Sequence, residues 1–252
     1  KIKRPVKFSF LDFSTLENRK HFCEEELKLN RRLEPEMYLG VLPVTRNLKI
    51  TEEAEKGKIV DYVVKMKRMD NSKEMDKLLA ENKITRSNIE KLAEKVARFH
   101  QNSCNVKNAF RTLKFHEEFA DIANQYDYIS EKLGDETKQK VSMCIENSFR
   151  YLNEIRNFSN HRIISGFQRD CHGDLNASNI FLYDEPVIFD CIEFSSELRQ
   201  IDVLNDIAFL CVDLDFYGHE YLSDYFYNKY CEYFELEKSD AETELFRYYK
   251  SY

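Results

Sequence analysis

Glycine and proline are scarce in this 252-residue sequence, with six and four copies respectively. No glycine-rich motif occurs, so phosphate binding by the backbone of a glycine-rich loop is not indicated. No apolar run approaches the roughly 18 to 20 residues needed to span a bilayer. The basic residues 1–7 lack the apolar segment of a signal peptide. We therefore expect a soluble globular protein.

Cysteine occurs in an odd number, and no two cysteines form a CxxC pair. Neither a disulfide framework nor a zinc site is indicated, so we expect a reducing, cytoplasmic compartment. Two of the cysteines, at positions 171 and 191, flank a histidine and an aspartate. Because no general-base pattern accompanies them, we interpret them as small packing residues. The seven are Cys23, Cys104, Cys144, Cys171, Cys191, Cys211 and Cys231.

Positive charge is also in short supply, since the formal net charge is -7. Nucleic-acid binding needs a basic surface, so neutral or cationic small substrates fit better. The acidic residues near the C-terminus could gather a polycationic substrate, although such runs are more often solvated helix faces. These residues are Asp213, Asp215, Glu220, Asp224, Glu232 and Glu235.

The fold class expected from the pattern of elements is α+β. Residues 1–69 form a β-rich N-terminal lobe, in which a capping-box pattern beginning at Ser14 starts a helix that runs to about Leu33. Strands are expected at residues 38–45 and 59–69, with a hairpin turn between them at residues 51–58. Residues 70–252 form a mainly helical C-terminal lobe.

Apolar residues recur at helical spacing through most of the C-terminal lobe. A short β-hairpin interrupts the helices, because two apolar runs at residues 180–183 and 187–190 are joined by Asp-Glu-Pro. Helices are expected at residues 88–100, 115–133, 135–158, 199–214 and 220–234.

The segment HGDLNASN at residues 172–179 carries the strongest chemical signal. Asp174 precedes Asn179 by five positions, and the hairpin returns a second aspartate, Asp190, to the same region. These three side chains would surround one small volume. Phosphoryl transfer requires hard oxygen ligands for magnesium and a carboxylate to orient the attacking hydroxyl. The spacing therefore predicts a phosphotransferase.

This HGDxxxxN segment, followed by an aspartate, resembles the catalytic loop of the aminoglycoside phosphotransferase family, which shares the two-lobed protein-kinase-like fold. The resemblance implies that ATP and Mg²⁺ are bound. It implies that Asp174 orients the substrate hydroxyl and that Asn179 and Asp190 bind magnesium, while His172 braces the loop. Most of the chain resembles a bacterial branch of the family, whose members often carry a second, C-terminal P-loop ATPase-like domain. Asn176 stands where this branch usually has a second histidine.

Matches to this branch include the N-terminal stretch through residue 33, ARFH, FDCIEF and IDVLNDIAFL. Both ends of the chain look cut from something longer, and a fused or partner P-loop domain is expected. Asp202 and Asp206 in the last match lie one helical turn apart. We interpret them as structural support for the catalytic loop. His100, in ARFH, is interpreted as a hydrogen-bonded core residue.

A buried ion pair is expected to anchor the phosphates. Glu26 lies on the apolar face of the first helix, and a buried carboxylate needs a partner. Lys1 and Lys3 share one face of the preceding strand, so either could pair with Glu26, and the resemblance favours Lys1. Residues 63–69 form the expected hinge, with Lys67 and Met69 as the candidates beside adenine.

Two alternatives remain open from the sequence. One is a nucleotide-binding or degenerate regulatory module that serves a P-loop domain, although such a module has no need of Asp174. The other is phosphorylation of a protein side chain, which is disfavoured because only about eight residues separate Asp190 from the next helix. The acceptor itself is not identified, because specificity lies in variable helices at residues 115–158 and after residue 199.

Overall fold

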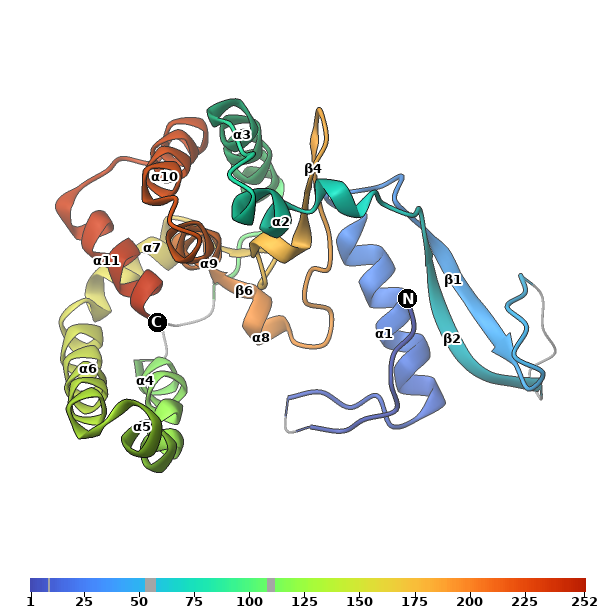
Figure 1. Cartoon of the computed structure of the whole chain (residues 1–252), viewed down its shortest axis with the longest axis horizontal. Helices are drawn as coiled ribbons and strands as arrows, with labels where there is room; N and C mark the ends of the chain where they lie inside the picture. Colours follow the sequence, from blue (N-terminus) through green and yellow to red (C-terminus); the bar gives the residue numbers. More distant parts are fainter. Residues whose placement is uncertain (9, 53–57, 108–111) are drawn as a thin grey trace.

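The computed structural model describes residues 1–8, 10–52, 58–107 and 112–252. Figure 1 shows an α+β chain in which one helix and a β-hairpin lie on one side and most helices on the other. We call residues 1–69 the N-terminal part and residues 70–252 the helical part. The hairpin turn expected at residues 51–58 falls largely outside the described residues.

The sheet of the N-terminal part is antiparallel. Strands β1 (Tyr38–Thr45) and β2 (Ile59–Met66) pair along their whole length. The first residues of the chain extend along the other edge of β2, where Val64 donates its backbone N–H to the Lys1 carbonyl oxygen at 2.9 Å. The β2 strand ends three residues earlier than the pattern predicted.

Helix α1 (Leu16–Asn30) packs against this sheet. Its cap is Thr15, whose side chain accepts the Asn18 backbone N–H at 3.1 Å. The predicted capping box at Ser14 is therefore wrong by one residue, because the Ser14 hydroxyl bonds instead to the Asp12 carboxylate at 2.5 Å.

A small apolar cluster fixes α1 on the sheet. Cys23 of α1 is fully buried against Met37, Tyr38 and Val64. Burying such side chains contributes on the order of 1.5–3 kcal/mol each for the larger ones. Glu26 lies three residues after Cys23, so it belongs to the same buried side of α1 and is also 0% exposed.

The core of the helical part is built mainly by four helices. These are α3 (Arg86–Asn102), α9 (Val203–Phe216), α10 (Glu220–Phe234) and α11 (Asp240–Ser251). The α3 and α11 helices each begin with a capping box, formed by Thr85 and Ser239 respectively. The apolar faces of all four meet in one core that also includes Leu175 of the HGD segment.

The helices between α3 and α9 differ from the expected two. Residues 115–133 divide into α4 (Thr112–Ala120), η3 (Asp121–Gln125) and α5 (Tyr126–Leu133). The second expected helix divides into α6 (Asp135–Glu154) and α7 (Arg156–Ile164). The break before α7 lets its side chains turn toward the main core, against which Ile155 and Phe158 pack.

The expected hairpin is present as β4 (Ile180–Leu182) and β5 (Pro186–Ile188), an antiparallel pair. Short elements surround it, namely η2 (Asn71–Lys73), α2 (Met75–Ala80) and η4 (Ala177–Asn179).

A second strand pair, β3 (Gln168–Asp170) with β6 (Gln200–Asp202), was not predicted. The helix expected from residue 199 begins later, because Asp202 caps α9 by accepting the Leu204 N–H at 2.9 Å. The short α8 (Ser196–Arg199) precedes β6. Among the described residues, no helix combines the length and the apolar character needed to traverse a bilayer.

Candidate active site

The loop after β3 carries the HGD sequence, and hydrogen bonds from His172 hold its shape. The imidazole Nδ1 accepts the Asp174 backbone N–H at 3.2 Å, and Nε2 lies 3.0 Å from the Phe189 carbonyl oxygen. These contacts require a neutral ring protonated at Nε2. Burial lowers the pKa of His172, which favours this neutral form. His172 therefore connects the loop to the end of the hairpin.

Gly173 is required by the backbone of the same loop. Its φ of +85° lies in the left-handed region, and an added Cβ would lie 3.0 Å from the Leu198 carbonyl oxygen. A larger residue would be both strained and crowded here. The backbone N–H of Gly173 is thereby directed at Asp206, with a distance of 2.7 Å to its Oδ1.

Asp206 supports the loop from α9 and is almost fully buried. Besides Gly173, it accepts the His172 N–H at 3.2 Å and contacts His100 Nε2 at 2.9 Å. Burial would raise the pKa of Asp206, but these hydrogen bonds and the nearby His100 outweigh burial and lower it. The geometry agrees with the interpretation of Asp206 as structural support.

Asp174 and Asn179 lie side by side. The Asn179 amide Nδ2 donates to both the carbonyl oxygen and Oδ2 of Asp174, at 2.9 and 3.0 Å. Asn176 donates to the other carboxylate oxygen at 2.9 Å, and its own Oδ1 caps the short η4. Asn176 thus has a local role in orienting Asp174 and starting η4.

Asp190 lies beyond the hairpin and is brought back toward Asn179. The neighbouring Phe189 donates its N–H to the Asn179 carbonyl oxygen at 3.1 Å. Asp190 has a φ of +66°, a conformation that is unfavourable for a residue with a Cβ. Its N–H lies 3.2 Å from the Tyr38 hydroxyl, so a residue of β1 stabilises this strained position.

Two lysines share the carboxylate of Glu26, whose side chain is 0% exposed. Lys1 Nζ lies 3.1 Å from Glu26 Oε1 and also pairs with Asp190. Lys3 Nζ lies 2.8 Å from Glu26 Oε2 and also pairs with Glu193. The sequence left open which of the two lysines pairs with Glu26, and in the structure both do. The four ion pairs form one network. Glu193 had no sequence signal of its own.

The two lysines differ in exposure, at 36% for the Lys1 side chain and 5% for Lys3. Burial would lower the pKa of each lysine, but the neighbouring carboxylates outweigh burial and raise it. Both therefore stay charged at neutral pH. Burial conversely raises the pKa of Glu193, which Lys3 only partly offsets. Lys3 is a fixed internal charge, whereas Lys1 reaches solvent.

The hinge candidates make contacts away from this ion-pair network. Lys67 donates its backbone N–H to the Met37 carbonyl oxygen at 2.9 Å, and its Nζ reaches Glu36 at 3.3 Å. Met69 is half-buried against the apolar cluster beneath α1. These contacts give neither side chain a role at the phosphate end of the site.

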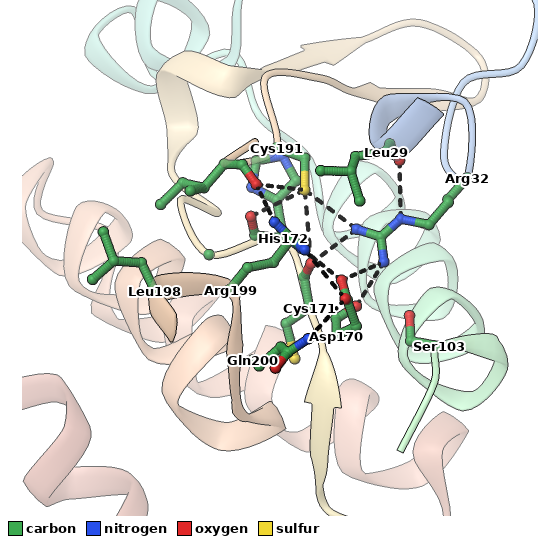
Figure 2. A network of polar contacts seen from close by, with 12 residues as sticks. Leu29, Arg32, Ser103, Asp170, Cys171, His172, Cys191, Leu198, Arg199 and Gln200 are labelled. Atoms are coloured by element: carbon green, nitrogen blue, oxygen red, sulfur yellow. Dashed lines mark hydrogen bonds and ion pairs between the residues drawn. The ribbon is translucent and has the colours of Figure 1, made fainter. Parts of the chain in front are cut away.

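Figure 2 shows a further network that the sequence analysis missed. Arg32, just after α1, donates to the carbonyl oxygen and Oδ1 of Asp170, both at 2.8 Å, and to the Cys171 carbonyl oxygen at 3.1 Å. Arg199 donates to Asp170 Oδ1 from the other side at 2.6 Å. This network joins α1 to β3, the strand that leads into the HGD loop. RDCHGD, the sequence leading into the loop, could have signalled a role for Asp170.

Two sets of side chains could be considered as metal ligands. His100, Cys171 and Asp206 bring ligand atoms within 4.8 Å of one another. Burial raises the pKa of the Cys171 thiol well above 9.0, and His100 is already bonded to Tyr230 and Asp206. The thiolate that a metal requires is therefore disfavoured, and this set is packing.

Asn179 and Asp190 form the second set, and their donors suit a hard cation. Within the described chain, Asn179 Oδ1 and Asp190 Oδ2 make no hydrogen bond, while Asn179 Nδ2 and Asp190 Oδ1 are engaged. Amide and carboxylate oxygens are the ligands that Mg²⁺ prefers. The residues present therefore fit a magnesium ion.

No family model matches this chain. Curated proteins of Mycobacterium tuberculosis and Mycobacterium bovis, described as uncharacterized, are 33% identical to it over 236 residues. The aligned segment covers 90% of this chain and 44% of theirs. The chain therefore spans less than half the length of the curated relatives it matches, and it is similar to one segment of those proteins.

Proposed function

We propose that this chain is an ATP-dependent phosphotransferase of the aminoglycoside phosphotransferase type, with the two-lobed protein-kinase-like fold. It would transfer the γ-phosphate of ATP to the hydroxyl of a small molecule. The observation that carries the proposal is the position of Lys1, which contacts the buried Glu26 and also Asp190, 189 residues away. A phosphate-binding lysine, its orienting carboxylate and a metal-binding carboxylate need this arrangement.

The two lysines would have different roles at the phosphates of ATP. Lys1 is exposed enough to leave Asp190 and bind phosphate oxygens when a nucleotide enters. Lys3 keeps Glu26 in place through this exchange, because it is buried between Glu26 and Glu193. Glu26 therefore need not be reorganised when Lys1 exchanges partners.

Asn179 and Asp190 would hold magnesium through their unpartnered side-chain oxygens. Bound Mg²⁺ supplies charge neutralisation at the β- and γ-phosphates. The strained backbone of Asp190 is consistent with a position determined by function rather than by local stability.

Asp174 would orient the acceptor hydroxyl and accept its proton. Asn176 and Asn179 each donate to the carboxylate, which holds it in one orientation. Preorganisation of this kind lowers the entropy that must be lost as the acceptor aligns. The adenine would lie against the backbone of residues 67–69, which is the role that the resemblance assigns to Lys67 and Met69.

The resemblance also suggests a P-loop ATPase-like domain as a fused partner. The curated relatives are more than twice as long as the segment they share with this chain, which leaves room for such a domain.

The test measures ATP turnover with Mg²⁺, with and without a panel of hydroxylated small molecules. Asp174→Asn is expected to reduce turnover by at least about 100-fold, the lower range for removal of a general base. Asp184→Asn, an exposed aspartate in the turn of the catalytic hairpin, is the matched control. If the protein binds ATP and magnesium but Asp174→Asn behaves like wild type, the chain is a nucleotide-binding module instead.

A further inference from the structure

A cavity of about 660 Å³ lies in the helical part, next to the catalytic loop. Its wall includes Gly173, the residue before Asp174. Most of the wall comes from α4, α7, α8, α9 and α11, which lie around one region of the helical part (Figure 1), and strands β3 and β6 and Ile192 complete it. This volume falls within the range of small-molecule sites, roughly 300–1,000 Å³.

The wall is mostly apolar. Phe209 of α9 is 46% exposed and lines the cavity, whereas the apolar residues on either side of it, Ala208 and Leu210, are buried. An exposed aromatic side chain at the rim of a cavity can cover the body of an apolar ligand. The apolar wall also includes Ile163, Ile192, Leu198, Val212 and Tyr252.

The charged side chains of the wall on α4, α8 and α11 are already paired. Lys114 Nζ pairs with Glu197 and lies 3.7 Å from Glu118. Lys250 pairs with Asp215 outside the cavity. Because these charged side chains already have partners of opposite sign within the chain, they do not favour a charged ligand of either sign.

The two aspartates of the wall are also engaged. Asp202 receives two hydrogen bonds from Arg162, at 2.7 and 2.9 Å. Asp206 holds the catalytic loop. Two of the acidic residues that could have gathered a polycation are engaged within the chain, since Asp213 accepts the Ala177 N–H and Asp215 pairs with Lys250.

Two neutral polar groups of the wall are unsatisfied within the described chain. The Ser159 hydroxyl is buried, with the residue 4% exposed, and has no hydrogen-bond partner. Asn205, half-buried on α9, makes no side-chain hydrogen bond there either. A buried hydroxyl without a partner is costly, so a ligand in this cavity would gain by placing a polar group where it can bond to Ser159.

We infer that this cavity is the acceptor site and that the acceptor is an uncharged ring alcohol rather than a polycation. The inference rests on the proposed function, because it places the acceptor hydroxyl at Asp174. The ring packs on Phe209, and a second polar group of the acceptor bonds to Ser159 and Asn205. The hydroxyl oxygen attacks the γ-phosphorus, the bond to the bridging oxygen of ADP breaks, and the hydroxyl proton passes to Asp174.

The experiment measures binding by ligand-observed NMR and phosphate transfer from ATP, in parallel. The probes are cyclohexanediol, benzyl alcohol and uridine, compared with the amino sugar kanamycin. Phe209→Asp is expected to weaken binding of the ring alcohols by about tenfold to 100-fold, the range that corresponds to loss of a buried aromatic contact. Phe216→Asp is the matched control, since it lies on the same helix, is 81% exposed and does not line the cavity.

Ser159→Ala separates a ligand contact from a structural role. Because Ser159 Oγ bonds to nothing in the described chain, this change should leave the melting temperature unchanged or slightly higher. It should weaken uridine binding by about threefold to tenfold, the loss of one hydrogen bond, while benzyl alcohol, with no second polar group, is unaffected.

The two readouts distinguish failure of this inference from failure of the proposed function. Kanamycin as the preferred ligand, or Phe209→Asp binding ring alcohols as well as wild type does, overturns the cavity assignment. An absence of binding by all three ring alcohols also overturns it. Ring-alcohol binding that is lost in Phe209→Asp, in a protein without Asp174-dependent transfer, supports the binding site and rejects the phosphotransferase.

Discussion

Lys1 and Lys3 provide a sharp test of the site, because two lysines on one strand share one carboxylate but differ in burial. Replacing Lys3 by Met removes the cation between Glu26 and Glu193, both nearly inaccessible to solvent. Breaking a buried ion pair in this way typically costs about 3–5 kcal/mol. Replacing Lys1 by Met affects a side chain that is 36% exposed, so we expect a loss of about 0–1 kcal/mol.

Urea unfolding followed by circular dichroism gives both values. Lys3→Met should be clearly the less stable variant, and the double variant Lys3→Met with Glu193→Gln should recover part of the loss, because one unpaired buried charge is then removed. For ATP turnover we expect the opposite order, with the larger loss in Lys1→Met. Lys1→Met should abolish ATP turnover in a protein that unfolds almost like wild type, because the proposed function assigns phosphate binding to Lys1.

Equal stability losses in the two single variants would refute the division of roles. So would a Lys1→Met protein that retains wild-type turnover. Lys3→Arg keeps the charge but not the compact geometry of the lysine. Compared with Lys3→Met, it should therefore recover more of the stability than of the ATP turnover.

Three further predictions follow from other parts of the chain. Because burial lowers the pKa of His172 below 6.5, the unfolded chain takes up a proton that the folded chain does not as the pH falls through 6.5. Stability should therefore decrease from pH 7 to pH 5, by at most about 1.4 kcal/mol per pH unit, and His172→Gln should flatten this slope in urea titrations. Thr15→Ala should cost about 1 kcal/mol of unfolding free energy through loss of the α1 cap, whereas Ser14→Ala should cost less; equal losses would contradict the observed cap. Ellman's reagent should modify two thiols rapidly, Cys104 and Cys144, because the other five are buried; rapid reaction of a third would show that the core opens.

Local sequence patterns were sufficient for many of the elements. Residues 88–100 have one apolar stripe and a strong cap, and they form the centre of α3. The two apolar runs joined by Asp-Glu-Pro form the β4–β5 hairpin as predicted. The burial of Glu26 also followed from its place in the apolar stripe of α1. In each case the signal lies within a few residues, where side-chain periodicity reports directly on burial.

The breaks within residues 115–158 were harder to predict. Gly134, with a φ of +86°, ends α5 and marked one boundary. The boundary between α6 and α7 has no glycine or proline, and it depends on α7 packing against a core formed by distant helices. Strands β3 and β6 were missed for the same reason, since three residues pair only when other elements bring them together.

By itself, the sequence determined the α+β character, the order of most helices and strands, and which polar side chains are available in residues 172–190. Only the tertiary structure decided that both lysines share Glu26, that Glu193 and Arg32 join distant segments, and that an apolar cavity lies beside Gly173. The physical reason is that ion pairs and cavities depend on distances between segments that are separated in the sequence, by 23 residues for Lys3 and Glu26 and by 190 for Lys3 and Glu193. Periodicity along the chain reports which face of an element is buried, but not which partner it meets.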